Sequence, residues 1–110
     1  TQVYSGTKAV DTTEWSLTTD TAGPDTSTTA GTYVLLLDLT DMVAGDELQI
    51  RCYEKCRSGD TQGILWQATR SNVQSEKVQA FYGPPLMHGW DMTLDAIAGT
   101  ITVLWSIRTP

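Results

Sequence analysis

The strongest alternation of apolar and polar positions lies near the end of the chain, from Trp90 to Arg108. Its large apolar residues are Trp90, Met92 and Leu94 before Gly99, and Ile101, Val103, Trp105 and Ile107 after it. Side chains two apart in a strand share a face, so each half is expected to be a strand with one apolar wall. Gly99 predicts a hairpin between the two strands. A two-stranded ribbon is marginal in water, so the rest of the chain must supply a second layer that covers this wall.

Shorter runs before this region also predict strands. The first are short, partly alternating segments at Gln2 to Tyr4, Lys8 to Val10 and Trp15 to Leu17, which read as one or two edge strands broken by Gly6 and Asp11. Tyr33 to Leu39 is almost continuously apolar, which is typical of a central strand covered on both sides. Further strands are expected at Glu47 to Lys55, Ile64 to Thr69 and Val78 to Tyr82.

The connections between these runs are short and rich in turn-forming residues. Thr40 to Asp46 predicts a single helical turn or a tight connection. No connection contains the dozen-residue helical pattern that a parallel crossover needs, which excludes a parallel α/β fold. About seven to nine short strands at about ten-residue spacing predict an all-β, antiparallel β-sandwich or jelly roll without a long helix. The 110 residues fit a single domain spanning residues 1–110.

The segment from Thr18 to Gly31 contains no large apolar residue. It is expected to be a long exposed loop or arm, rich in threonine and glycine. Asp20 and Asp25 raise the alternative of a cation site, but an aspartate beside glycine and proline more often makes a local turn.

Net charge, the absence of targeting signals and the cysteine spacing limit the partners and the compartment that are expected for this protein. The formal net charge of −6 opposes extended contact with nucleic acid phosphates and with anionic membrane surfaces. The sequence contains neither a membrane-length apolar run nor the pattern of a signal peptide, so synthesis in a cytoplasm is expected. Cys52 and Cys56 would lie about 13 Å apart in one strand, beyond disulfide reach, and are expected to be free thiols.

The candidate catalytic and metal-binding residues are few. His88 is the only histidine, and no nucleophile motif accompanies it, so a turn or interface role is the preferred reading. Cys52, Cys56 and His88 would supply three zinc ligands at most and lack the usual spacing.

Acidic and aromatic residues offer two more candidates. Asp46, Glu47, Asp91 and Asp95 could act as a glycosidase pair, but they alternate with the buried wall as a solvated face does. Trp15, Trp66, Trp90 and Trp105 could form a platform for sugar rings. Trp66, Trp90 and Trp105 are in register with aliphatic residues and are therefore assigned to the core, while Trp15 is left open. No catalytic, cofactor-binding or metal-binding residue is assigned.

A set of turn and core patterns carries a family resemblance. These are Ala44-Gly45-Asp46-Glu47-Leu48 leading into Ile50 to Lys55, then Gly89 to Leu94, Ala98-Gly99-Thr100 and Trp105 to Arg108. Residues 33 to 108 thereby resemble the small β-sandwich virion proteins of tailed bacteriophages. The patterns concern turns and core positions, so they carry over no functional residue.

The resemblance implies a non-enzymatic structural protein, in the first place a decoration (cement) protein on the capsid exterior. Its partners would be the major capsid protein and other copies of itself, with a homotrimer as one arrangement. The alternatives are a neck or tail component of the same particle, a carbohydrate-binding module and a small glycan-active enzyme. The arm at residues 18–31 and the segment before Trp15 are the parts expected to be free to order on a partner. The acidic balance fits an outer surface better than one facing packaged DNA.

Overall fold

The computed structural model describes all 110 residues, and every regular element in it is a strand. The strands are β1 (Gln2–Val10), β2 (Trp15–Ser16), β3 (Thr21–Ala22), β4 (Val34–Asp38), β5 (Glu47–Glu54), β6 (Gly63–Ser71), β7 (Val78–Tyr82), β8 (Asp91–Ala98) and β9 (Ile101–Arg108). No helix long and apolar enough to cross a bilayer occurs.

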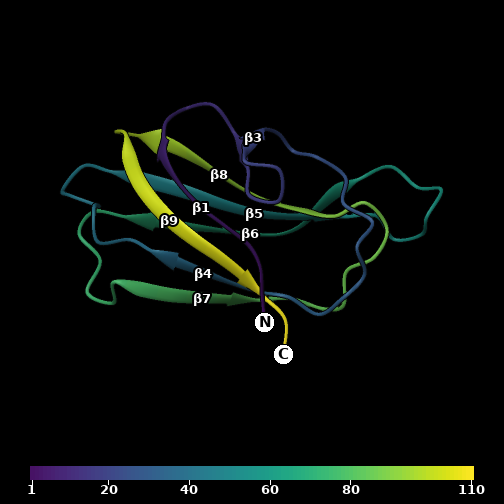
Figure 1. Cartoon of the computed structure of the whole chain (residues 1–110). Coiled ribbons are helices and arrows are strands. Elements are labelled where there is room, and N and C mark those ends of the chain that lie inside the picture. Colours follow the sequence, from purple (N-terminus) through teal and green to yellow (C-terminus); the bar gives the residue numbers. More distant parts are fainter.

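The strands form two antiparallel sheets that pack face to face (Figure 1). One sheet has four strands in the order β1-β9-β4-β7, and the other has five in the order β3-β2-β8-β5-β6. The predicted all-β sandwich is confirmed. The two termini lie side by side, and the amino group of Thr1 donates to the Thr109 carbonyl at 2.8 Å.

The predicted hairpin between β8 and β9 is wrong. β8 pairs with β2 and β5 in the five-stranded sheet, whereas β9 pairs with β1 and β4 in the other. The turn at Gly99 therefore carries the chain from one sheet to the other, and its φ of +82° suits glycine. The apolar walls of the two strands face each other across the core, because each wall can then bury the other.

The first strand also differs from expectation. β1 runs without interruption through Gly6, which was expected to break it, and pairs with β9 along its length. Gly6 lies opposite Trp105, and a Cβ at this position would come within 2.5 Å of the indole. The glycine is thus explained by close packing inside a strand, as glycines in strands often are.

β4 has neighbours on both edges but is covered on only one face, contrary to the prediction. Leu35 and Leu37 are fully buried between the sheets, while Val34 and Leu36 are half-buried on the outer face. The segment after it is a tight connection without a helical turn. Its backbone is tied by Asp46, whose carboxylate accepts from the Val43 amide at 2.9 Å.

The core contains the aliphatic side chains of both inner faces together with two of the tryptophans. Trp90 is fully buried, and its ring centroid lies 4.4 Å from that of Tyr33, with the two rings tilted by 32°. Its indole N–H donates to the Thr29 carbonyl at 2.9 Å. Trp105 is also buried, and its indole N–H donates to the Leu17 carbonyl at 3.1 Å. Trp66 lies at the margin of the core, half-buried, against Phe81.

Most of the segment from Thr18 to Gly31 is exposed, and it is fastened to the sandwich at several points. β3 pairs with β2, and single bridges join Ser27 to Trp90 and Gly31 to Leu86. The segment is therefore a loop held against the body of the protein rather than a free arm.

Candidate functional site

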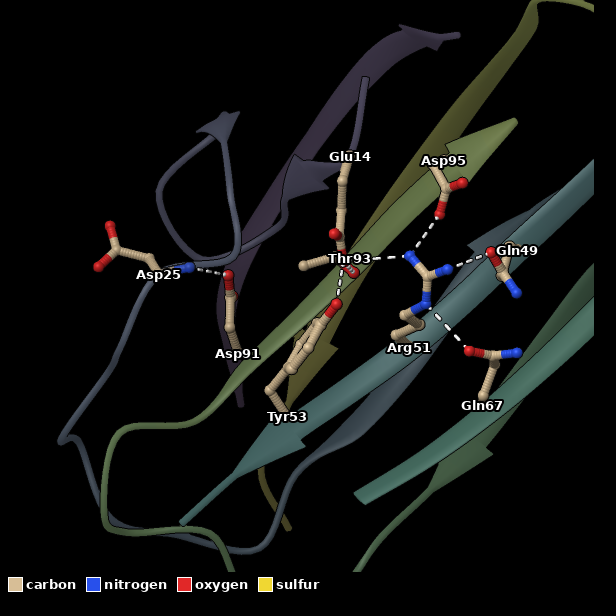
Figure 2. Close-up of polar contacts among 9 residues, drawn as sticks. All are labelled: Glu14, Asp25, Gln49, Arg51, Tyr53, Gln67, Asp91, Thr93 and Asp95. Carbon is tan, nitrogen blue, oxygen red and sulfur yellow. Dashed lines mark hydrogen bonds and ion pairs between the residues drawn. The ribbon is translucent and has the colours of Figure 1, made fainter. Parts of the chain in front are cut away.

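A polar network covers the outer face of the five-stranded sheet, with Arg51 of β5 at its centre (Figure 2). The guanidinium Nη1 contacts Asp95 of β8 at 3.0 Å and Glu14 at 3.5 Å. Nε donates to Gln67 of β6 at 3.0 Å, and Nη2 donates to Gln49. One arginine thus joins three neighbouring strands, because outward positions on adjacent strands lie within side-chain reach.

Glu14 forms the second node of this network. It lies just before β2, and its Oε2 accepts from the hydroxyls of Tyr53 and Thr93, each at 2.5 Å. Burial together with the bond to Glu14 raises the pKa of Tyr53 to about 12. Burial also raises the pKa of Asp95, and the Arg51 charge opposes that increase. The hydroxyls and the guanidinium therefore serve to hold Glu14 and Asp95 in place.

Asp91 anchors the long loop to the sheet. Its side chain is fully buried, and its two oxygens accept from the Thr18 hydroxyl and the Asp25 amide, both at 2.8 Å. It also accepts from the Met92 amide at 2.9 Å. Burial raises the pKa of Asp91, while these hydrogen bonds act to lower it. The Asp91 carboxylate thus accepts hydrogen bonds from loop donors that have no acceptor within the loop.

The four carboxylates considered as a glycosidase pair have separate surroundings. Asp91 and Asp95 lie four residues apart on one strand, about 13 Å by strand rise. Asp91 holds the loop and Asp95 holds Arg51, while Asp46 caps the turn before β5. Glu47 begins β5 beside Ala98, at the opposite end of the strand from Tyr53. The structure brings no two of them together at one hollow.

The histidine and the two cysteines also have different surroundings. Cys52 is buried in β5, where burial raises its pKa to about 12, and Cys56 is exposed in the following turn. Both are free thiols. The backbone amide of His88 donates to Glu54 at 3.1 Å, which fixes the loop before Trp90. No group of three His, Cys, Asp or Glu residues is arranged to hold a metal ion.

Six of the ten exposed large apolar side chains belong to two groups. The first, here called the loop-end patch, comprises Ile64, Leu65 and Met87, which are 53%, 44% and 44% exposed. Ile64 and Leu65 border a hollow of about 330 Å³ next to Glu54. Met87 adjoins it, because its amide donates to Glu54 at 2.7 Å.

The second group, here called the sheet face, lies on the outside of the four-stranded sheet. Its apolar members are Val34, Leu36, Val78, Ala80, Tyr82 and Leu104. They are neighbours by strand register, because Leu36 pairs with Ala80 and Val34 pairs with Tyr82. Leu36 and Leu104 border a shallow hollow of about 210 Å³. A continuous apolar surface on a monomer marks an interaction site.

Sequence reasoning missed both the Arg51 network and the sheet face. A signal for the sheet face was present, because Leu104 interrupts the polar positions of its strand between Thr102 and Ser106. The Arg51 network had no such signal. Its members are Glu14, which lies before β2, and residues of β5, β6 and β8 (Figure 2). Only the order of the strands in the sheet brings them together.

Comparison with known proteins adds no family assignment. No family model, no curated protein and no solved structure matches the chain. The resemblance to phage virion proteins therefore depends on the sequence patterns alone.

Proposed function

We propose that this protein is a non-enzymatic capsid decoration (cement) protein of a tailed bacteriophage. In this proposal it binds the outer face of the shell formed by the major capsid protein and stabilises that shell. The observation that carries the proposal is the presence of two groups of exposed apolar side chains, the loop-end patch and the sheet face, on a small compact sandwich. A protein that bridges neighbours needs two adhesive surfaces held at a fixed spacing.

The charged groups support an adhesive role over a catalytic one. Arg51, Glu14 and Asp95 are engaged with one another, and Asp91 is engaged with the loop. A general acid or base must be within reach of a substrate proton, and these groups are instead within reach of their own structural partners. The net charge of −6 favours an exterior position, away from packaged DNA.

The loop-end patch is the surface we propose for the capsid shell. Ile64 and Leu65 border a hollow where the chain leaves β5 and enters β6. The loop between these two strands lies at one end of the sandwich (Figure 1). Ile64 is 53% exposed, and removing it from water in a contact would contribute about 1–2 kcal/mol. Many such contacts, repeated over a shell, stabilise it through avidity.

Capsids that lack the protein provide the test. The purified protein is added to such shells, which are then sedimented, and we expect saturable binding that raises the temperature at which the shells disassemble. Ile64→Ser should weaken this binding at least tenfold. Ile97→Ser is the matched control, because Ile97 is 49% exposed in the same sheet but lies near Glu47, at the opposite end of β5 from Tyr53, the partner of Ile64. Equal weakening by both variants, or no binding by the unmodified protein, would overturn the proposal.

Copy number separates this proposal from a place in the neck or tail of the same particle. Binding to a shell gives on the order of hundreds of copies per particle, whereas a position on the tail axis gives about six or twelve. Quantitative mass spectrometry of purified particles distinguishes the two.

A carbohydrate-binding module would need exposed indoles. Trp90 and Trp105 are buried, and Trp15 and Trp66 are half-buried against the core. Titration of the protein with a panel of glycans, followed by tryptophan fluorescence, should give no saturable change at micromolar concentration.

A further inference from the structure

The sheet face is made of three rows of outward side chains that run across the strands. The rows follow from the strand register: Thr7, Leu104, Asp38 and Val78; then Ser5, Ser106, Leu36 and Ala80; then Arg108, Val34 and Tyr82. Leu104 is 50% exposed, Val78 60% and Tyr82 72%. The middle row contains no charge, and each outer row contains one, Asp38 in the first and Arg108 in the third.

Asp38 and Arg108 form no ion pair with each other within one chain. Asp38 pairs with Leu104 in the register, and Arg108 pairs with Val34, so their backbones lie about four residues apart along the strands, roughly 13 Å. Only Oδ1 of Asp38 is occupied, by the amide and hydroxyl of Thr40. Arg108 uses only Nε, which donates to Ser106 at 3.0 Å. Oδ2 of Asp38 and both terminal nitrogens of Arg108 therefore remain available.

Consider two copies of the chain packed sheet face to sheet face, related by a two-fold axis that runs across the strands at the Leu36–Ser106 pair. In this arrangement the charges of one copy can pair with those of the other. Such an axis exchanges the outer rows, so the row with Arg108 in one copy lies against the row with Asp38 in the other. Because β4 and β9 are adjacent, the two side chains are then offset by about one strand spacing, roughly 4.8 Å, which an arginine spans. The contact forms twice, once on each side of the axis.

We infer that the sheet face is the contact between two copies of this chain, which pair back to back about a two-fold axis with Arg108 of each copy bound to Asp38 of the other. The face is self-complementary in this arrangement, because Leu36 lies at the centre and Val78 of one copy faces Tyr82 of the other. The charge balance also favours it, because the face is locally neutral although each chain carries −6. A neutral face lets two acidic proteins approach where most of their surfaces repel.

The size of the face sets the strength of the dimer. Four strands span about 19 Å, and the five residues of β4 and β7 span about 17 Å. The area buried between two copies is then below that of stable interfaces, in the range of weak and transient ones. We therefore expect a reversible dimer with a dissociation constant in the micromolar range.

The dimer contact and the proposed shell contact use different residues, because no residue of the loop-end patch belongs to the sheet face. If both are correct, the dimer presents two loop-end patches and links two neighbouring sites on the shell. Sedimentation of the free protein tests the dimer, and sedimentation with capsids tests the shell contact, so the failure of one is distinguishable from the failure of the other.

Analytical ultracentrifugation of the purified full chain is the first experiment. The unmodified protein should pass from monomer to dimer over about 1–100 μM. Leu104→Ser should shift this transition at least tenfold upward, and the matched control Ile97→Ser should leave it unchanged. Circular dichroism confirms that both variants are folded.

A charge exchange tests the two-fold geometry. Arg108→Asp and Asp38→Arg each place like charges opposite one another in a homodimer, so each variant alone should remain monomeric. In an equimolar mixture the first variant contributes two acidic groups and the second two basic groups, so the heterodimer should form with an affinity close to that of the unmodified protein. Recovery on mixing is specific to this axis.

Three results would overturn the inference. They are a chain that stays monomeric above 100 μM, a Leu104→Ser variant that dimerises normally, and single charge variants that show no recovery on mixing. Loss of capsid binding by Leu104→Ser without any dimer in the unmodified protein would assign the sheet face to the shell instead.

Discussion

The indole of Trp105 on β9 lies directly over the backbone of Gly6 on β1, its partner across the sheet. A Cβ on Gly6 would come within 2.5 Å of Cζ2 of that indole. The ring is held from its other side too, because its N–H donates to the Leu17 carbonyl in the core. Because Gly6 has no Cβ, the Trp105 indole can pack against the backbone of β1.

Gly6→Ala is therefore expected to destabilise the fold. The added methyl must displace Trp105 or bend β1, and overpacking of this kind costs about 1–3 kcal/mol. Urea unfolding followed by tryptophan fluorescence measures the change. Gly63→Ala is the control, because a Cβ at this strand position meets no atom within 4 Å, and it should leave stability within about 0.5 kcal/mol. An unchanged midpoint for Gly6→Ala would show that the indole has room to move.

Arg51→Met tests the polar network on the five-stranded sheet. Removing the guanidinium leaves Asp95 beside Glu14 without a counter-charge, so the pKa of Asp95 in the folded state should rise further. The folded variant then binds more protons than the unfolded chain, so its stability should fall as pH rises from about 4.5 to 7. We expect a loss of about 1–3 kcal/mol at neutral pH that becomes smaller in acid.

The control for this change is Arg57→Met. Arg57 is 84% exposed and pairs with Asp60 at the surface, where an ion pair contributes little. Its unfolding midpoint should match that of the unmodified protein at both pH values. A loss for Arg51→Met that is equal at both pH values would argue against electrostatic coupling.

Asp91→Asn should release the loop from Thr18 to Gly31. Whichever way the amide points, its NH₂ group meets a donor, either the Asp25 amide or the Thr18 hydroxyl and Met92 amide. The unsatisfied donor should cost about 1–3 kcal/mol. Limited proteolysis should then cut within the loop. Asp25→Asn keeps the backbone donor and should resist cleavage like the unmodified protein.

The buried thiol predicts a loss of stability in alkaline solution. Burial raises the pKa of Cys52 to about 12, so the folded chain keeps a proton that the unfolded chain loses at lower pH. The unfolding free energy should therefore fall as pH rises through the ordinary thiol range, about 8.5. Tyr53 acts in the same direction, since its pKa is also raised to about 12.

Cys52→Ala and Cys56→Ala separate the contribution of the buried thiol. Denaturant midpoints at about pH 7.5 and pH 10 should differ less in Cys52→Ala than in the unmodified protein. In Cys56→Ala the difference should be unchanged, because Cys56 is exposed. An identical pH dependence in all three proteins would contradict a buried, protonated Cys52.

Alternation along the sequence was enough to predict every strand except β3, which lies in the segment expected to be a loop, and most of what each strand buries. Ile101, Val103, Trp105 and Ile107 all face the core, as their spacing predicted. This information is local, because a strand places successive side chains on opposite faces whatever it pairs with. The all-β class followed from the number and spacing of such runs.

Only the tertiary structure decided which strands are neighbours. The same alternation in β8 and β9 fits a hairpin or two walls that face each other, and the turn at Gly99 permits both. The choice depends on how the remaining strands fill the sheets, which involves residues far apart in the chain. The Arg51 network and the sheet face are products of that choice. The face of the strand on which a side chain lies follows from the local sequence. The residues that the side chain contacts depend on the packing of the whole chain.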